Sequence, residues 1–477
     1  MSAKFATSVA PHSQPGRSRK PIWGVLVGVG VALPAIVWFW GFTVDDALIT
    51  ARVALHLSQG FGARFNAGGP LADAVTPLGY AQLLALFGRG SVLGVFALAK
   101  WLGAAAWLVA AAVLGVLVSS AGQRWQRFTP LGLVAVSAPL AAWSVSGMET
   151  GLVTLLSTLG LLGGAGGALV VGAAAAWRPE LVPFACTLVI GRALAKHAGW
   201  QQAALHSLLS LAPVLVIALL RLSSFGRAVP LAFYAKPSDF AHGFRYACGA
   251  FAFGGLPWLA LCTPKQWLRL PPEARVLLAA LVAHGAALLL CGGDWMAFYR
   301  LAVPVLPCAA LAAAHVAEQA SAGFAIPRVA LALAGALLLA LGLGPEARGV
   351  GADRERLIAA ARPVLANDPR IAALDVGWVG AASNAEVIDL AGVTDPEVAF
   401  FRGGHTSKQI PAAWLFARKP TAIVLLLARG APLESPFQDS SFSRLVEQRV
   451  AALVASDYRP RTTLSLAGQR YVVLEPL

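Results

Sequence analysis

Charged residues are scarce in this chain of 477 residues. Only 13% of them are Asp, Glu, Lys or Arg, whereas 57% are hydrophobic, and the mean hydropathy is +0.68. A soluble protein of this length carries charge on roughly a quarter of its residues. The composition therefore excludes a cytosolic enzyme and a disordered tail protein, and it indicates a chain that lies mainly in a membrane.

Several motifs are also missing. The five cysteines form no CxxC pair, which excludes a disulfide scaffold. There is no GxxxxGK[ST], no GxGxxG after a strand and no GxSxG, so nucleotide hydrolysis and serine hydrolase chemistry have no visible site. The net charge is +14. Its basic residues are scattered in short loops, which favours a role in membrane topology over binding of nucleic acid.

Long apolar segments dominate what is present. The first, residues 22–42, is about as long as a membrane-spanning helix and follows four basic residues, so residues 1–21 are predicted to be a cytoplasmic tail. It is too long for a signal peptide and lacks a cleavage site. We predict a mostly α-helical, polytopic membrane fold over 22–344 with about nine to twelve transmembrane helices. The further apolar segments lie near 76–119, 129–145, 151–177, 180–194, 200–221, 248–263, 276–291, 296–317 and 326–344.

Polar segments between these helices are predicted to meet on one face of the membrane. Lys265, Arg269 and Arg275 form a basic loop that should be cytoplasmic. Alternation of the helices then places the segments 225–247, 292–295 and everything beyond 350 outside. Counting from the N-terminus places the outer loop 43–75 on that same face.

The composition changes near residue 350. A polar helix is expected to open at residues 353–356, and the runs 371–375, 422–427 and 470–474 resemble strands. We therefore expect a small extracytoplasmic α/β domain over residues 350–477.

The candidate site begins with Asp45 and Asp46, two adjacent carboxylates where the first span ends. Charges at a membrane are costly unless they are used or paired. Neighbouring residues of a helix point about 100° apart. One carboxylate could therefore act as a general base while the other holds Arg52, a substrate hydroxyl or a divalent cation. The alternative is an ordinary helix N-cap.

Other candidate residues lie at the expected outer ends of helices. Asp294 and Arg300 follow a Gly-Gly pair, and Lys236 lies in an aromatic and cationic loop suited to a phosphate group. An interfacial aromatic belt and a solvated loop are the alternative interpretations. A structural ion pair is the more ordinary role for Glu149, Arg178 and Glu180, and loop formation for His405.

The order of these segments resembles that of the GT-C glycosyltransferases, most closely the branch containing the mycobacterial arabinofuranosyltransferases that terminate cell-wall arabinan. The resemblance covers most of the chain. It rests on 45–52 and its continuation to residue 78, and on the segments 147–150 (GMET), 178–180 (RPE), 234–236 (YAK), 292–300 (GGDWMAFYR), 375–380, 386–395 and 404–405.

The resemblance implies a GT-C-like catalytic domain over 22–344 in a bacterial cytoplasmic membrane, with its site outside. A sugar, such as arabinofuranose or another pentose or hexose, would pass from a polyprenyl-phosphate donor to a glycan, lipid or protein acceptor, with inversion. Asp45 is the favoured base. No cofactor is certain, and a divalent cation at Asp45 or Asp46 is left open. The other residues implied in binding are Arg52, Asn66, Glu149, Arg178, Glu180, Tyr234, Lys236, His242, Asp294, Arg300 and His405.

Two other functions remain as alternatives. A transporter or flippase of a lipid-linked glycan would use the same charges to bind and not to react. A non-catalytic subunit of an envelope assembly would use mainly its C-terminal domain. Neither alternative, nor the transferase, requires nucleic acid as a partner.

Overall fold

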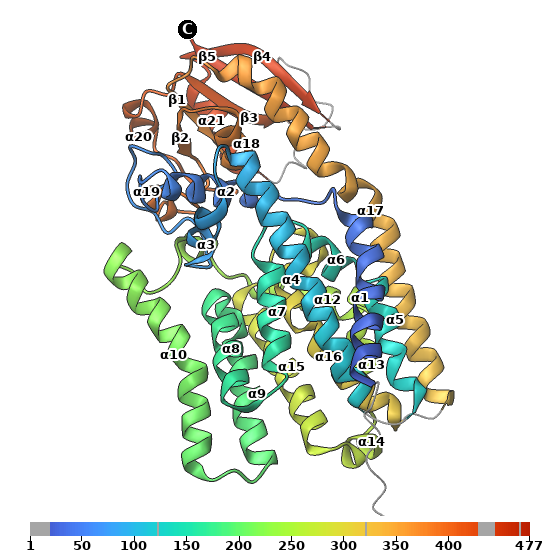
Figure 1. Ribbon diagram of the computed structural model, residues 1–477. Helices are drawn as coiled ribbons and strands as arrows, with labels where there is room; N and C mark the ends of the chain where they lie inside the picture. Colours follow the sequence, from blue (N-terminus) through green and yellow to red (C-terminus); the bar gives the residue numbers. More distant parts are fainter. Residues whose placement is uncertain (1–19, 122–123, 320–321, 428–443, 467–468) are drawn as a thin grey trace, which may run out of the picture.

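The computed structural model describes residues 20–121, 124–319, 322–427, 444–466 and 469–477 (Figure 1). Residues 1–19 of the expected cytoplasmic tail lie outside these ranges.

The N-terminal part is a helical body. Its elements are α1 (Lys20–Phe39), α2 (Asp45–Ser58), α3 (Tyr80–Phe87), α4 (Val92–Ser120), η1 (Trp125–Phe128), α5 (Thr129–Ala135), α6 (Ala138–Ser144), α7 (Thr150–Gly160), α8 (Gly164–Trp177), η2 (Pro179–Leu181), α9 (Val182–Ala195), α10 (Trp200–Phe225), α11 (Leu231–Ala235), α12 (Phe240–Phe253), α13 (Leu256–Ala260), α14 (Pro264–Arg269), α15 (Pro272–Cys291), η3 (Ala297–Val305), α16 (Leu306–Glu318) and α17 (Ala322–Leu365).

Membrane-spanning character is evident in six of these helical segments. Within the described residues, α1, α4, α10, α15, the continuous segment of η3 and α16, and α17 are each long and apolar enough to cross a membrane. The shorter helices α7 and α8 are also apolar. This confirms a mostly helical membrane protein, and the total of nine to twelve crossings stays a prediction.

Glycines mark real breaks between helices. Gly90 and Gly163 both have a positive φ, of 88° and 77°, and they lie in the turns before α4 and α8. A left-handed backbone of this kind is open to glycine at little cost. The chain therefore turns at both glycines.

The expected boundary between residues 344 and 350 lies within one helix. Helix α17 continues without a break from the helical body through Pro345 to Leu365. It is held by close packing against the end of α1: the Gly351 amide donates to the Gly41 carbonyl at 2.8 Å, and the Arg348 guanidinium lies 3.9 Å from the centre of the Trp38 ring. This contact stabilises the helix where its composition turns polar.

The C-terminal domain is a mixed five-stranded sheet with strand order β2-β1-β3-β5-β4. Strands β1 and β2 are parallel, β1 and β3 are parallel, and β5 is antiparallel to β3 and β4. The small C-terminal α/β domain is therefore confirmed. Its elements are β1 (Arg370–Ala373), α18 (Val376–Ala382), β2 (Glu386–Asp389), α19 (Pro396–Ala399), α20 (Ala412–Ala417), β3 (Ala422–Leu427), α21 (Leu445–Val454), β4 (Tyr458–Leu466) and β5 (Gln469–Pro476).

The sheet joins the helical body through one of its faces. Alternate residues of a strand point to opposite faces. Ile371 and Ala373 belong to the same apolar core as the helices, whereas Ala372 and Leu374 belong to a second core that includes α21. The C-terminal domain is thus packed onto the helical body by the hydrophobic effect as well as by α17.

Figure 1 places the sheet at one end of the helical body and α14, which carries two of the three residues of the expected cytoplasmic loop, at the other. The four polar segments expected on one face meet beside the sheet. Lys236 reaches Asp46 at 3.8 Å, and the Trp295 and His405 rings lie 6.0 Å apart. The Gly377 amide donates to Asp45 at 2.7 Å.

Candidate active site

A cavity of about 100 Å³ lies where α2, the loop of residues 74–77, α11, η3 and the C-terminal domain meet. Its charged lining consists of two acids and three bases, an excess of positive charge that suits an anionic group. We call it the charged cavity. Its ionisable lining residues are Asp46, Glu149, Arg178, Lys236 and Arg300.

Asp46 is the carboxylate of the pair that faces this cavity. It lies in the first turn of α2, and its Oδ2 is 3.8 Å from the Lys236 Nζ. About a quarter of each side chain is exposed, 28% for Asp46 and 25% for Lys236, so both can reach a bound molecule. Lys236 follows α11 and also lies 6.0 Å from the centre of the Trp295 ring.

Asp45 connects α2 to the C-terminal domain and to α17. Its carboxylate accepts hydrogen bonds from the Gly377 and Trp378 amides at 2.7 and 2.9 Å, and it pairs with Arg354 of α17 at 3.3 Å. Burial raises the pKa of Asp45 to about 6, although Arg354 opposes the shift. A Cβ atom at Gly377 would lie 2.2 Å from the Asp45 carbonyl oxygen, so this approach requires glycine. The helix-cap alternative expected Asp45 to bind the amides of its own helix, α2. Asp45 instead binds amides in the first turn of α18.

A buried ion pair lines one part of the cavity. Glu149 and Arg178 are in direct contact, and their side chains are 1% and 6% exposed. Arg178 also lies 3.7 Å from Glu180, which does not line the cavity. The expected structural ion pair is present, but both Glu149 and Arg178 also face the cavity, so they are available to a ligand.

The turn that carries Glu149 is fixed from several sides. Gly147 has a φ of 84°, and a Cβ there would meet the Phe96 ring at 2.7 Å. The Tyr80 hydroxyl donates to the Gly147 carbonyl at 3.2 Å, and the Thr43 hydroxyl donates to the Ser146 carbonyl at 2.9 Å. Such a rigid support holds a charged side chain in one position.

Arg300 enters the cavity from a strained turn. Phe298 and Tyr299 both have a left-handed backbone, with φ of 60° and 49°, which non-glycine residues adopt at a cost of about 1–3 kcal/mol. Strain of this kind is concentrated at functional sites. The Arg300 guanidinium lies 5.4 Å from the centre of the Trp143 ring, and its Nε is 2.8 Å from the Asp294 Oδ2.

Asp294 affects the cavity through its ion pair with Arg300. It does not line the cavity itself. Burial would raise the pKa of Asp294, but the charges of Arg300 and Lys236 outweigh burial and hold this pKa below its ordinary value. The carboxylate therefore stays ionised and orients Arg300.

The C-terminal domain contributes a histidine beside the cavity. Burial and the charge of Lys236 lower the pKa of His405 to about 4, although Asp46 and Asp294 oppose the shift. The imidazole is therefore neutral near pH 7 and packs beside Trp295.

Four expected site residues lie away from the charged cavity. Arg52 donates to the carbonyls of Phe65, Gly380 and Ala385 at 2.5–2.9 Å, so it joins two parts of the chain. Tyr234 packs against the Phe400 ring at 4.9 Å. The His242 Nδ1 lies 2.6 Å from the Gly292 carbonyl oxygen.

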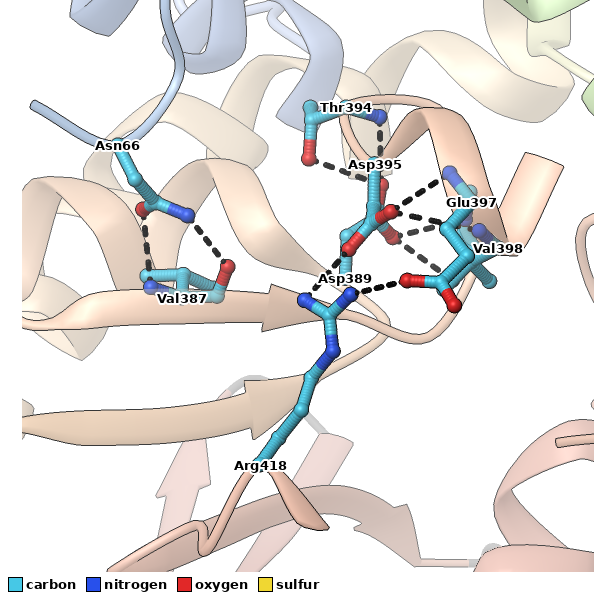
Figure 2. Close-up of polar contacts among 10 residues, drawn as sticks. Asn66, Val387, Asp389, Thr394, Asp395, Glu397, Val398 and Arg418 are labelled. Carbon is cyan, nitrogen blue, oxygen red and sulfur yellow. Dashed lines mark hydrogen bonds and ion pairs between the residues drawn. The ribbon is translucent and has the colours of Figure 1, made fainter. Parts of the chain in front are cut away.

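The fourth is Asn66, whose side chain pairs with the backbone of Val387 like a neighbouring strand, with two bonds of 2.9 Å (Figure 2). Figure 2 also shows how the loop after β2 is closed. Asp389 accepts bonds from the amides of Ala391, Gly392 and Thr394, and this loop carries Val393 to the cavity. Arg418 pairs with Asp395 at 3.1 Å and fixes the next turn.

Sequence reasoning missed Arg354, Asp73 and Arg221. Arg221, near the end of the apolar helix α10, lies 2.7 Å from Asp73 and also donates to the Thr76 carbonyl. It thereby holds the loop of residues 74–77 against the cavity. An arginine within an apolar span was the available signal.

No metal-binding group is evident among the described residues, since no three His, Cys, Asp or Glu side chains gather there. The nearest charged partner of Asp46 is a lysine, and that of Asp45 is an arginine. Each carboxylate of the pair therefore faces a cation of the protein.

Residues 351–474 match the model of a family described as a domain of unknown function (DUF8728). The matched region begins within α17 and includes the C-terminal sheet. No curated protein and no solved structure matches the chain.

Proposed function

We propose that the protein is a membrane glycosyltransferase that moves a sugar from a polyprenyl-phosphate donor to an acceptor of the cell envelope. The observation that carries the proposal is the position of Asp46, facing Lys236 in a cavity that Arg178 and Arg300 also line. The resemblance of the ordered motifs to GT-C glycosyltransferases supports the same function.

In the proposed reaction, Asp46 accepts the proton of an acceptor hydroxyl as its oxygen attacks the anomeric carbon of the donor. A new carbon–oxygen bond forms, and the bond from that carbon to the phosphate oxygen breaks. The electron pair leaves with the phosphate. Attack from the face opposite the leaving group inverts the configuration at this carbon.

The cationic residues have a separate task in this reaction. Negative charge grows on the phosphate as it leaves, and positive groups already in place stabilise that charge without reorganising. Lys236, Arg178 and Arg300 line the same cavity as Asp46 and supply such charge. Asp294 and Glu149 keep two of these cations in position.

We propose Asp46 as the base, although the family resemblance favoured Asp45. The oxygens of Asp45 already accept two backbone amides and contact Arg354, so a substrate hydroxyl would have to displace them. Asp46 has no such backbone partner among the described residues and lines the cavity.

The proposed location is a bacterial cytoplasmic membrane, with the cavity and the C-terminal domain on its outer face. Nucleotide sugars are confined to the cytoplasm, so an outward-facing transferase needs a sugar already carried across on a lipid. A polyprenyl-phosphate sugar meets that requirement. Acceptors of glycan, lipid or protein nature are all compatible with it.

Replacement of Asp46 tests the proposal. Asp46→Asn should lower sugar transfer from a polyprenyl-phosphate donor by on the order of 1000-fold, because the amide cannot accept the proton. The measurement follows free polyprenyl phosphate released by the purified protein. Asp353→Asn, at a partly exposed position in α17, serves as the matched control and should keep full activity.

Two results would contradict the proposal. Full release of polyprenyl phosphate by Asp46→Asn would exclude this base. A wild-type protein that moves a lipid-linked glycan across a bilayer without releasing polyprenyl phosphate would be a transporter.

A further inference from the structure

A second, larger cleft lies on the other side of α2. It has a volume of about 1110 Å³ and is enclosed by the end of α2, the loop after it, the end of α17 and the segment 380–386 of the C-terminal domain. We call it the domain cleft. Ligand sites of proteins often lie between two structural units and reach such volumes.

The walls of the domain cleft are fixed to one another. Arg52 joins α2 to the carbonyls of Gly380 and Ala385, and Asn66 binds the backbone of Val387 with both ends of its amide. Arg52 is 4% exposed, so these bonds are protected from water. The two units are thus held at a set separation, and the cleft exists before any ligand binds.

Five exposed polar side chains line the cleft and have hydrogen-bonding groups without a protein partner among the described residues. Across the ranges that the structure describes, the side chains of Gln59, Arg362, Asn367, Asn384 and Glu386 make no hydrogen bond or ion pair. Amides and carboxylates offer donors and acceptors that pair with hydroxyl groups. Phe61 adds an aromatic ring that is 47% exposed.

The charge of the cleft is balanced. Its lining holds two arginines, Arg52 and Arg362, and two acids, Asp368 and Glu386. Burial lowers the pKa of His56, so this histidine is neutral at pH 7. The charged cavity has an excess of bases, but the domain cleft offers no net charge that would favour a phosphate or a polyanion.

We infer that the domain cleft binds a neutral oligosaccharide, which is the acceptor of the proposed transfer reaction. Binding of the oligosaccharide is inferred from the cleft itself, and only its role as the acceptor rests on the proposed function. The same helix connects the two sites, since Asp46 and Leu55 line different cavities and are separated by about 14 Å along α2. An oligosaccharide spans that distance, and a single sugar ring does not.

Binding can be tested without any transfer reaction. The full-length protein in lipid nanodiscs is mixed with fluorescently labelled neutral arabino-, manno- and gluco-oligosaccharides of increasing length, and with oligogalacturonides as acidic probes. We expect at least one neutral series to bind, with an affinity that rises with length and exceeds that of the acidic series. Binding of none, or stronger binding of the acidic series, would overturn the inference.

Two variants on opposite walls locate the binding. Gln59→Trp and Asn384→Trp should each weaken oligosaccharide binding by at least 10-fold, because a large ring would fill the cleft. Ala455→Trp, an exposed residue outside the cleft, is the control and should bind normally. Unaltered binding in either cleft variant would contradict the assignment. If either cleft variant fails to fold, Ala366→Trp replaces it.

The two proposals can fail separately. Cleavage of a polyprenyl-phosphate sugar by water, measured on the wild-type protein without acceptor, reports on the charged cavity alone. Cleavage without oligosaccharide binding would overturn the cleft inference only. Oligosaccharide binding that both cleft variants weaken, in a protein that never cleaves the donor, would keep the cleft and reject the transferase.

Discussion

At the scale of single residues, the adjacent carboxylates have different tasks because a helix points them in different directions. Asp45 is bound by the backbone of the C-terminal domain, and Asp46 faces the charged cavity. The sequence predicted such a division. It could not say which residue had which task, since the partners of Asp45 are more than 300 residues away.

Lys236 is the cation nearest to the proposed base. Lys236→Met should lower transfer by on the order of 100-fold, because a preorganised charge near the leaving phosphate is lost. Lys236→Arg should retain part of the activity. Initial rates at varied donor concentration give this result, with Lys265→Met at the opposite end of the molecule as control. Equal rates in Lys236→Met and the control would show that Lys236 has no role.

His405 gives a pH-dependent prediction. The unfolded histidine, with its ordinary pKa near 6.5, binds a proton between about pH 4 and 6.5, while the folded one, with a pKa of about 4, does not. Stability should therefore fall as the pH falls through this window, and rise with pH up to about 6.5.

His405→Gln should remove part of that dependence. The unfolding temperature of wild type and variant is measured at pH 4.5 and pH 7 in the same detergent. We expect a smaller difference between the two pH values in the variant. An identical difference in both proteins would mean that His405 titrates normally.

At the scale of elements, the loop after β2 depends on one buried carboxylate. Asp389 is fully buried and accepts three backbone amides and the Thr394 hydroxyl. Asp389→Ala would leave these donors without a partner and should destabilise the loop by about 2–4 kcal/mol.

Hydrogen exchange of the segment 390–395 measures this effect. The loss corresponds to exchange faster by on the order of 100-fold. Asp457→Ala, at an exposed position between α21 and β4, is the control. Unchanged protection of the Thr394 amide in Asp389→Ala would contradict the prediction.

The sequence predicted some elements better than others, for physical reasons. β1, β3 and β5 were expected because buried strands are apolar runs. β2 was missed because its sequence, EVID, has only two apolar residues between two acids, and β4 because its sequence, YRPRTTLSL, contains arginines and a proline. The break near Pro345 was expected from composition, but the packing of Gly351 on Gly41 keeps α17 helical.

The site shows the same limit. Asp46 and Arg300 were predicted because charges at the ends of apolar helices are unusual, and Lys236 because it lies in an aromatic and cationic loop; all three line the charged cavity. The partners of Arg52 are backbone carbonyls, which every residue carries, so no residue type marked them in the sequence. The domain cleft was not predicted at all, because it exists only where two distant segments are packed together.

At the scale of the whole molecule, the C-terminal domain and the basic loop that includes α14 are expected on opposite sides of the membrane. In a protein whose five cysteines are replaced, Ala455→Cys should react with a membrane-impermeant maleimide on intact spheroplasts. Lys265→Cys should react only after permeabilisation. The opposite result, or labelling of both positions on intact spheroplasts, would reject the orientation and with it the use of an exported donor.

Helix α17 has a further consequence for experiments on the intact protein. Because it runs unbroken from the helical body to the first strand, it acts as a stiff rod that couples the sheet to the lipid bilayer. A thinner bilayer favours a greater tilt of such a helix. Because Asp45 and Arg52 bind the C-terminal domain to the helical body, the sheet and the helices should tilt together. The acyl-chain length of the reconstituted lipid should therefore change how the site is oriented in the membrane, and not its width.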